Sequence, residues 1–122
     1  MKILQKICFV LLMAIFLSSC SSITQVYSGD CFKDKDVDDC RVKAEQGNSE
    51  AQYVLGKMYY KGQGVPQDYQ ESANWYRKSS EQGNSNSQLN LGMLYETGKG
   101  VLQNYKESVK WYRKSAEKGR SL

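Results

Sequence analysis

The chain has 122 residues, of which 40% are hydrophobic and 25% are charged, and its formal net charge is +4 at pH 7. This length supports one domain with one continuous core, and charges of mixed sign exclude the basic footprint of a nucleic-acid-binding protein. Histidine is absent, which removes the commonest general base and metal ligand, so we expect no enzyme, no metal site and no cofactor.

Residues 1–19 have the layout of an export signal. Lys2 and Lys6 precede an apolar run that ends at Leu17. The run is too short to span a bilayer comfortably, and small residues follow it, as in a secretory signal peptide. We therefore exclude residues 1–19 from the fold. Without them fifteen basic and thirteen acidic side chains remain, and no nucleic-acid partner is expected.

Residues 17–20 read Leu-Ser-Ser-Cys, which resembles the lipobox of bacterial lipoproteins. The resemblance implies that Cys20 is lipid-modified, becomes the first mature residue and anchors the protein to a membrane. The residue after the cysteine is Ser21 and not aspartate, which resembles the signal that sorts lipoproteins to the outer membrane. The alternative is an ordinary secretory signal with Cys20 merely near the cut. Residues 20–30 are rich in serine, threonine and glycine and predict a tether, which reaches about 30 Å when fully stretched.

Cys31 and Cys40 remain after Cys8 is assigned to the signal and Cys20 to the lipid. Disulfides persist in exported proteins, so we expect these two cysteines to form one. On a straight helix their Cα atoms would lie about 13 Å apart, beyond the limit of ~7 Å for a bridge. A bridge therefore requires the chain to reverse between them. The alternative is two free thiols.

An acidic run at Asp34, Asp36, Asp38 and Asp39 follows the first of these cysteines. A calcium loop of this kind would also need a glycine and a closing glutamate, and both are missing. We interpret the aspartates as acids at the start of a helix, where the helix dipole favours them. Residues 31–46 then form an N-terminal cap that contains the tail of a helix.

The rest of the chain is an internal repeat. Residues 47–82 and 83–118 agree at twenty of thirty-six positions, and a period of this length is typical of stacked structural units. Each unit is predicted to contain two helices. Asn48 is placed to cap the first helix and Gly62 to end it in a left-handed turn, and Asp68 opens the second with a capping-box pattern.

Two features shared by the units indicate how the helices pack. A glycine recurs inside the first helix, as Gly56 and Gly92, where it costs about 1 kcal/mol relative to alanine. Its recurrence indicates that a helix or an aromatic ring packs directly on the backbone. A Trp-Tyr pair recurs at 75–76 and 111–112, and we interpret it as inter-helix packing rather than a ligand-binding box.

The motif Gly-Asn-x-x-Ala-Gln-x-x-Leu-Gly-x-Met-Tyr-x-x-Gly-x-Gly-Val at 47–65, followed by Asp-Tyr-x-x-Ser-Ala-x-Trp-Tyr-x-Lys at 68–78, closely resembles the Sel-like repeat family. These repeats are related to the tetratricopeptide repeats. The resemblance implies an all-α fold, a short right-handed α-solenoid of antiparallel helix pairs that serves as an interaction scaffold. We expect five helices, one of them partial. Ser87 and Asn90 replace an alanine and a valine of the first unit, so the second unit should pack more loosely.

Positions that differ between the units are candidates for partner binding, because packing demands are shared by the units and binding demands need not be. On the first helix of each unit they are Tyr53, Lys57, Tyr60, Leu89, Met93 and Glu96. Each triplet forms one stripe of its helix, and in tetratricopeptide-like solenoids the first helices line the concave surface. This mixture suits a protein or peptide partner. The alternative is that these are unconstrained surface positions.

These observations predict a non-catalytic protein–protein interaction module, anchored by lipid in the bacterial cell envelope and facing the periplasm from the outer membrane. Ser115 and Lys118 match a serine acyl-enzyme motif by letter, but its companion motifs are missing. The alternatives are a cell-wall (peptidoglycan)-associated enzyme or accessory factor, and a secreted effector that acts on a host.

The C-terminal end of the repeat is expected to lack a covering helix. The last helix carries Trp111 and Tyr112, which would then be open to solvent, and uncapped repeats tend to associate. We therefore expect self-association through this helix. Residues 119–122 are assigned to a short tail.

Overall fold

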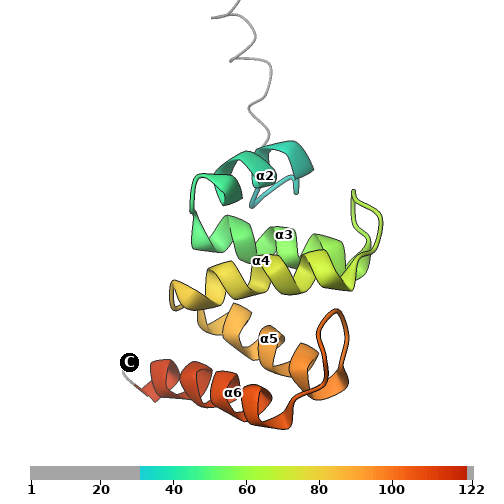
Figure 1. Cartoon of the computed structure of the whole chain (residues 1–122). Coiled ribbons are helices and arrows are strands. Elements are labelled where there is room, and N and C mark those ends of the chain that lie inside the picture. Colours follow the sequence, from blue (N-terminus) through green and yellow to red (C-terminus); the bar gives the residue numbers. More distant parts are fainter. Residues whose placement is uncertain (1–30, 121–122) are drawn as a thin grey trace, which may run out of the picture.

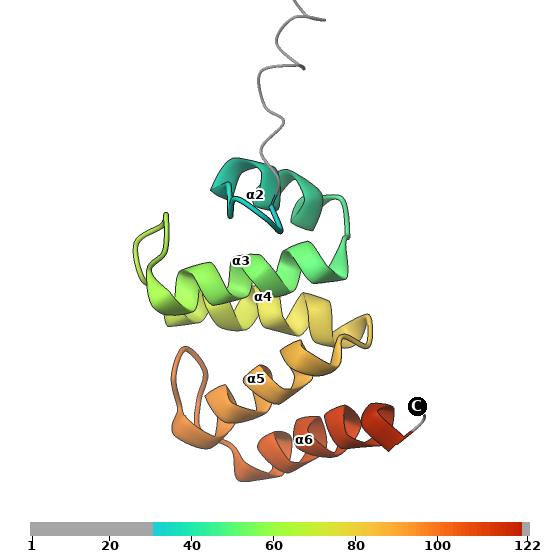
Figure 2. The same ribbon diagram turned by 180° about the vertical axis from the view of Figure 1, so that it is seen from behind.

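The computed structural model describes residues 31–120, and within that range it contains helices and no strand. The helices are α2 (Val37–Glu45), α3 (Ser49–Lys61), α4 (Tyr69–Glu81), α5 (Ser85–Thr97) and α6 (Tyr105–Arg120). They stack in chain order: the short α2 lies at one end of the stack, and two antiparallel pairs, α3–α4 and α5–α6, follow it (Figures 1 and 2). The predicted all-α repeat fold with five helices is confirmed.

Several sequence predictions fall on residues outside this range. The signal peptide of residues 1–19, the lipidation of Cys20 and the tether of residues 20–30 all lie outside the described residues. None of the helices between residues 31 and 120 has the length and apolar character that crossing a membrane requires.

Helix α3 begins and ends at its predicted capping residues, α4 begins at its predicted cap, and α5 repeats the pattern of α3. The side chains of Asn48 and Asn84 each accept a hydrogen bond from the backbone N–H three residues further on. The carboxylate of Asp68 accepts from two N–H groups in the first turn of α4. Gly62 and Gly98 follow α3 and α5 with left-handed φ angles of 69° and 71°. Caps of this kind satisfy backbone groups that a helix end leaves without a partner.

The recurring glycine of each first helix contacts an aromatic ring, as predicted. A Cβ atom on Gly56 would lie 2.7 Å from two ring carbons of Tyr76, and one on Gly92 would lie 2.7 Å from the same two atoms of Tyr112. The tyrosine of the second helix therefore packs on bare backbone of the first. Only glycine permits the two helices of each pair to approach this closely.

The core runs through the stack as two clusters of buried side chains. The first consists of Cys31, Cys40, Ala44, Ala51, Leu55 and Met58, and the second of Ala73, Tyr76, Leu91, Leu94 and Trp111. The half-buried Trp75 packs against the first cluster. The Trp-Tyr pairs are therefore packing residues, as the sequence indicated.

The second unit packs as closely as the first at Ser87, contrary to expectation. Ser87 has no exposed surface, like Ala51 at the same position of the first unit. Its hydroxyl donates to the hydroxyl of Ser79 over 2.7 Å. Because both oxygens find a partner, the extra polar atom is buried without an unsatisfied group.

The helix α2 contacts α3 in the way that a second helix contacts the first helix of the next unit. Arg41 donates to the hydroxyl of Tyr59 over 3.2 Å, and Arg77 of α4 donates to that of Tyr95 over 2.9 Å. Both pairs join a second helix to the first helix that follows it. The α2–α3 interface therefore repeats the α4–α5 interface, and α2 differs in being shorter, with nine residues against thirteen.

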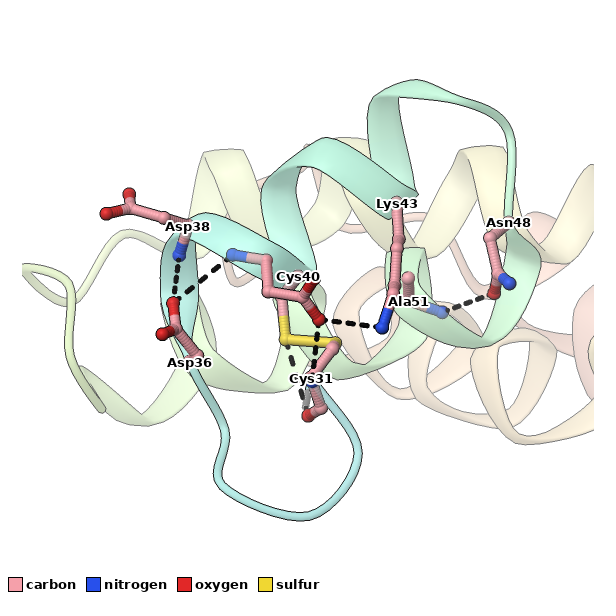
Figure 3. Close-up of polar contacts among 8 residues, drawn as sticks. Cys31, Asp36, Asp38, Cys40, Lys43, Asn48 and Ala51 are labelled. Carbon is pink, nitrogen blue, oxygen red and sulfur yellow. Dashed lines mark hydrogen bonds and ion pairs between the residues drawn. A yellow bond between two sulfur atoms is a disulfide. The ribbon is translucent and has the colours of Figure 1, made fainter. Parts of the chain in front are cut away.

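A disulfide joins Cys31 to Cys40, whose Cα atoms lie 4.6 Å apart. The chain reverses between them before α2 begins (Figure 3). Asp36 caps α2 by accepting from the N–H groups of Asp38 and Asp39, so these acids start a helix, as predicted. The carboxylate of Asp39 also accepts from the N–H of Cys31 over 2.8 Å. The turn is thus held to α2 by a covalent bond and a hydrogen bond.

Lys43 strengthens this arrangement from one turn further along α2. Its ammonium lies 2.7 Å from the carboxylate of Asp39. The hydrogen bond from Lys43 lowers the pKa of Asp39; desolvation opposes the shift, while the N–H of Cys31 adds to it. The carboxylate therefore stays ionised and keeps its hold on the turn at neutral pH.

The C-terminal end differs from the prediction in two ways. The helix α6 continues through Gly119 to Arg120, so half of the predicted tail 119–122 is helical. Basic residues in the last turn stabilise such an end. Trp111 is only 6% exposed, because it packs in the second cluster beneath α5. The expectation that Trp111 is open to solvent is therefore wrong. The exposed large apolar side chains of α6 are instead Tyr105 and Val109.

Candidate partner-binding groove

A groove with a volume of about 270 Å³ lies between α3 and α5, the first helices of the two units. Its lining residues are Tyr53, Lys57, Tyr60 and Lys61 of α3, Tyr76 of α4, and Asn90, Met93 and Leu94 of α5. Tyr76 and Leu94 are only 2% and 1% exposed and lie at the floor, where Asn90 makes a hydrogen bond with Tyr76. The other lining residues stand on the two sides of the groove. The groove therefore runs along the face that the first helices share.

Four of the six predicted binding residues line this groove: Tyr53, Lys57, Tyr60 and Met93. The other two do not. Leu89 is 46% exposed on α5, outside the groove. Glu96 accepts a hydrogen bond from the hydroxyl of Tyr112 over 2.6 Å, so it is engaged on the side of α6.

The sequence comparison missed four lining residues, and the reasons differ. Leu94 and its counterpart Met58 are both apolar, so the position suggested core packing in both units. Lys61 lies one turn beyond Lys57 on the same stripe, so a longer stripe would have included it. Asn90 differs from its counterpart Val54, but the difference was attributed to packing. Tyr76 is identical in both units, so a search for differences cannot find it.

Aromatic packing holds the walls in place. The ring centroids of Tyr53 and Tyr76 lie 6.2 Å apart, a normal distance for a packed aromatic pair. The ammonium of Lys57 lies 4.6 Å from the centroid of Tyr53. At the opposite end, Lys99 lies 5.7 Å from the centroid of Tyr60 and 3.5 Å from its hydroxyl. The lysine heads are therefore placed at the edge of the groove over aromatic faces.

The floor is neutral. Burial raises the pKa of Tyr76 well above its ordinary value of 10.0, although a hydrogen bond with Asn90 lowers it in part. The phenol is therefore protonated at physiological pH. Together the hydroxyl and the amide give the groove uncharged hydrogen-bonding groups below its charged edge.

The edge is positively charged. Lys57 and Lys61 belong to the lining, which contains no carboxylate, and Lys99 lies at its end. Within residues 31–120 none of these three lysines forms an ion pair. The groove therefore presents cations whose charge is not neutralised by the described part of the chain.

A second hollow, of about 90 Å³, lies on the other side of α3. Its lining includes Cys31 and Phe32 from the disulfide-linked turn, Val54 and Met58 from α3, and again Lys57 and Lys61. The two lysines thus line both hollows. The face of α3 between them forms a ridge that carries positive charge, which we call the lysine ridge (Lys57 and Lys61).

Comparisons with known proteins agree with this architecture. The Sel1 repeat model matches residues 49–84 and 85–119. A protective antigen with an SLR fold from uropathogenic Escherichia coli is 49% identical over 66% of this chain and 17% of its own, with a TM-score of 0.65. A Sel1 repeat protein from Oxalobacter formigenes is 46% identical over 60% of this chain and 29% of its own, with a TM-score of 0.59.

A third solved structure, the cysteine rich protein B of Helicobacter pylori, is 26% identical over 82% of this chain and 74% of its own, with a TM-score of 0.67. A search of curated proteins finds no match. The chain spans less than a third of the length of the first two structures. With both full units matched by the family model, the chain belongs to the Sel1 repeat family, whose members are generally protein-interaction modules.

Proposed function

We propose that this protein is a non-catalytic scaffold that binds a partner protein in the groove between α3 and α5. The observation that supports this most strongly is the convergence of residues that differ between the units. Tyr53, Lys57 and Tyr60 of one helix and Met93 of another line one groove, although packing alone would allow the two units to be identical there. Tyrosine and methionine walls are typical of surfaces that hold a peptide.

The groove is suited to binding rather than to acid–base chemistry. Its lining consists of lysines, tyrosines, an amide and apolar side chains. Paired carboxylates, or a nucleophile beside a base, would be needed for hydrolysis, and the lining offers neither. This favours the scaffold over a cell-wall enzyme.

A charge introduced at one side of the groove tests this function. Met93 is 39% exposed, so Met93→Glu should leave the fold intact while it places a charge in the groove. Leu89→Glu is the matched control, because Leu89 lies one turn earlier on α5, is similarly exposed and is outside the groove. Tyr53 and Tyr60 are less suitable, since both pack against the second core cluster.

The experiment is photo-crosslinking in living cells, with the crosslinking residue at position 57. We expect a discrete covalent adduct with the partner, which Met93→Glu removes and Leu89→Glu retains. Melting temperatures of the two variants should agree. Adducts that persist in Met93→Glu would show that the partner does not occupy the groove.

We propose further that Cys20 carries the lipid that holds this scaffold in the bacterial envelope. The sequence at 17–20 supports this, and so does a disulfide of the kind that exported proteins keep. Cells grown with a radioactive fatty acid should label the wild type and not Cys20→Ser, and the variant should leave the membrane fraction. An unlabelled wild type would point to an ordinary secretory signal, and its appearance in the culture medium would favour the secreted effector.

A further inference from the structure

The lysine ridge is a site of unneutralised positive charge between two hollows. Lys57 and Lys61 are four residues apart and therefore lie on one face of α3. Both line the hollow toward α5 and the hollow toward the disulfide-linked turn. Lys99 adds a third ammonium beside Tyr60. Like charges on one face repel one another, so an anion bound beside them would be favoured.

Apolar side chains occur on both sides of the ridge, although Lys35 and Gln63 also line the smaller hollow. Met93 and the more deeply buried Leu94 line the larger hollow, and Val54 and Met58 line the smaller one. These apolar side chains attract apolar groups, which a highly charged polyanion lacks. The occupant must therefore be apolar at its flanks and acidic at its centre.

The floor of the larger hollow offers hydrogen-bonding groups that suit a peptide backbone. Asn90 lies there beside the neutral hydroxyl of Tyr76, and an amide is both a donor and an acceptor. An extended peptide presents such groups along its length and spaces alternate side chains about 6.6 Å apart. It can therefore place one side chain in a hollow and the next on the ridge.

We infer that the partner segment is an extended acidic peptide that crosses α3, with an Asp or Glu side chain on the lysine ridge between two apolar residues that enter the hollows. The acid is internal rather than a C-terminal carboxylate, because hollows on both sides of the ridge allow the peptide to continue past it. This inference rests on the proposed function, since it specifies the chemistry of the partner for the same groove.

A random library of 12-residue peptides, displayed between two fixed flanks, tests this inference when it is selected against the full chain. We expect the selected peptides to be enriched in Asp or Glu with an apolar residue two positions before it and another two positions after it. Synthetic copies with blocked ends should bind at least about tenfold more weakly to Lys57→Glu/Lys61→Glu, as expected for charge reversal in a binding site. Their affinity should also fall as salt is added.

The matched control is Lys106→Glu/Arg113→Glu, which makes the same change in net charge at two exposed positions of α6. It should bind the peptides as the wild type does. A new selection on the ridge variant should favour Lys or Arg in place of the acid. Lys57→Gln/Lys61→Gln removes the charge without reversing it and should weaken binding several-fold. This second variant keeps the test valid if the double charge reversal disturbs folding.

The outcomes separate this inference from the proposed function. Peptides without acidic enrichment that still lose binding in Met93→Glu would overturn the inference and leave the groove as the binding site. Peptides that need a free C-terminal carboxylate would also overturn it. A library that yields no peptide sensitive to Met93→Glu would contradict both the inference and the proposed function.

Discussion

Alanine is normally preferred to glycine inside a helix by about 1 kcal/mol, and at Gly56 we expect the opposite. A methyl group there would lie 2.7 Å from two ring carbons of Tyr76, and this ring is buried against the second core cluster. We predict that Gly56→Ala lowers the free energy of unfolding by about 1–3 kcal/mol, the usual cost of overpacking. Urea denaturation followed by circular dichroism measures this change.

Gly92→Ala is the natural control, because the same clash there involves a ring that is less confined. Tyr112 is half-buried on α6, so it can turn toward solvent more easily than Tyr76. The loss of stability should be smaller, although the carbonyl of Ser108 lies 3.3 Å from the added atom. An equal or larger loss at Gly92 would show that the backbone contact, and not the ring, decides the cost.

Tyrosine ionisation should destabilise the fold at high pH. Burial raises the pKa of both Tyr76 and Tyr112 above the ordinary value of 10.0, and for Tyr112 the hydrogen bond and charge of Glu96 add to the shift. Above pH 10 the unfolded chain therefore binds fewer protons than the folded chain, and stability falls as the pH rises. Thermal melts from pH 8 to 11 should show this decline.

The variant Tyr76→Phe should make that decline shallower, since it removes one of the groups that hold a proton only when folded. The variant Tyr112→Phe removes the other such group and should also make the decline shallower. A decline that is as steep in both variants as in the wild type would place its origin elsewhere.

At the scale of single elements, α2 depends on the disulfide. A helix of nine residues is too short to be stable alone in water, and the bridge holds it to the turn at Cys31 (Figure 3). In sequence, Cys40 stands thirty-six residues before Tyr76. Cys40 therefore occupies the position of α2 that is equivalent to Tyr76 in α4, and its disulfide is buried where the full unit buries a tyrosine ring.

We predict that Cys31→Ala/Cys40→Ala loses at most about 3 kcal/mol of stability, since the closed loop is small. The loss should be local. In hydrogen exchange, α2 should become the first helix to lose protection while α5 and α6 keep theirs. Protection that falls evenly over all helices would instead show that the stack unfolds as one unit.

The sequence predicted helix ends better than contacts across the stack, for a physical reason. Asn48, Asp68 and Gly62 act on backbone within a few residues of themselves, so a local pattern is enough to identify them. The burial of Ser87 depends on the hydroxyl of Ser79 in another helix, which no local pattern reveals. For the groove, unit differences found one stripe of α3 and missed Tyr76, which serves packing and the groove floor together.

At the scale of the whole molecule, the outer face of α6 carries the most exposed large apolar side chains of the described helices. Val109 is 52% exposed, whereas its counterpart Ala73 in α4 is 1% exposed because α5 covers it. Tyr105 is 64% exposed on the same helix. We therefore propose that two copies associate through α6, since such a patch gains free energy when it is covered.

We predict that sedimentation velocity shows a concentration-dependent dimer of the wild type and that Val109→Glu abolishes it. Lys106→Glu, an exposed charge reversal on the same helix, should weaken it less. A strictly monomeric wild type at high concentration would refute this contact and leave the groove unaffected.

Neighbouring units meet through contacts that recur at a fixed spacing. Gln52 donates to the carbonyl of Ala44, and Gln88 donates to that of Ser80. A further copy of residues 49–84, inserted after Asn84, would therefore join its neighbours by bonds of the same kind and require no newly invented surface. Each inserted copy would extend the shared face by one more hollow. In the proposed mode of binding, duplication of one unit would therefore lengthen the bound peptide by a fixed number of residues.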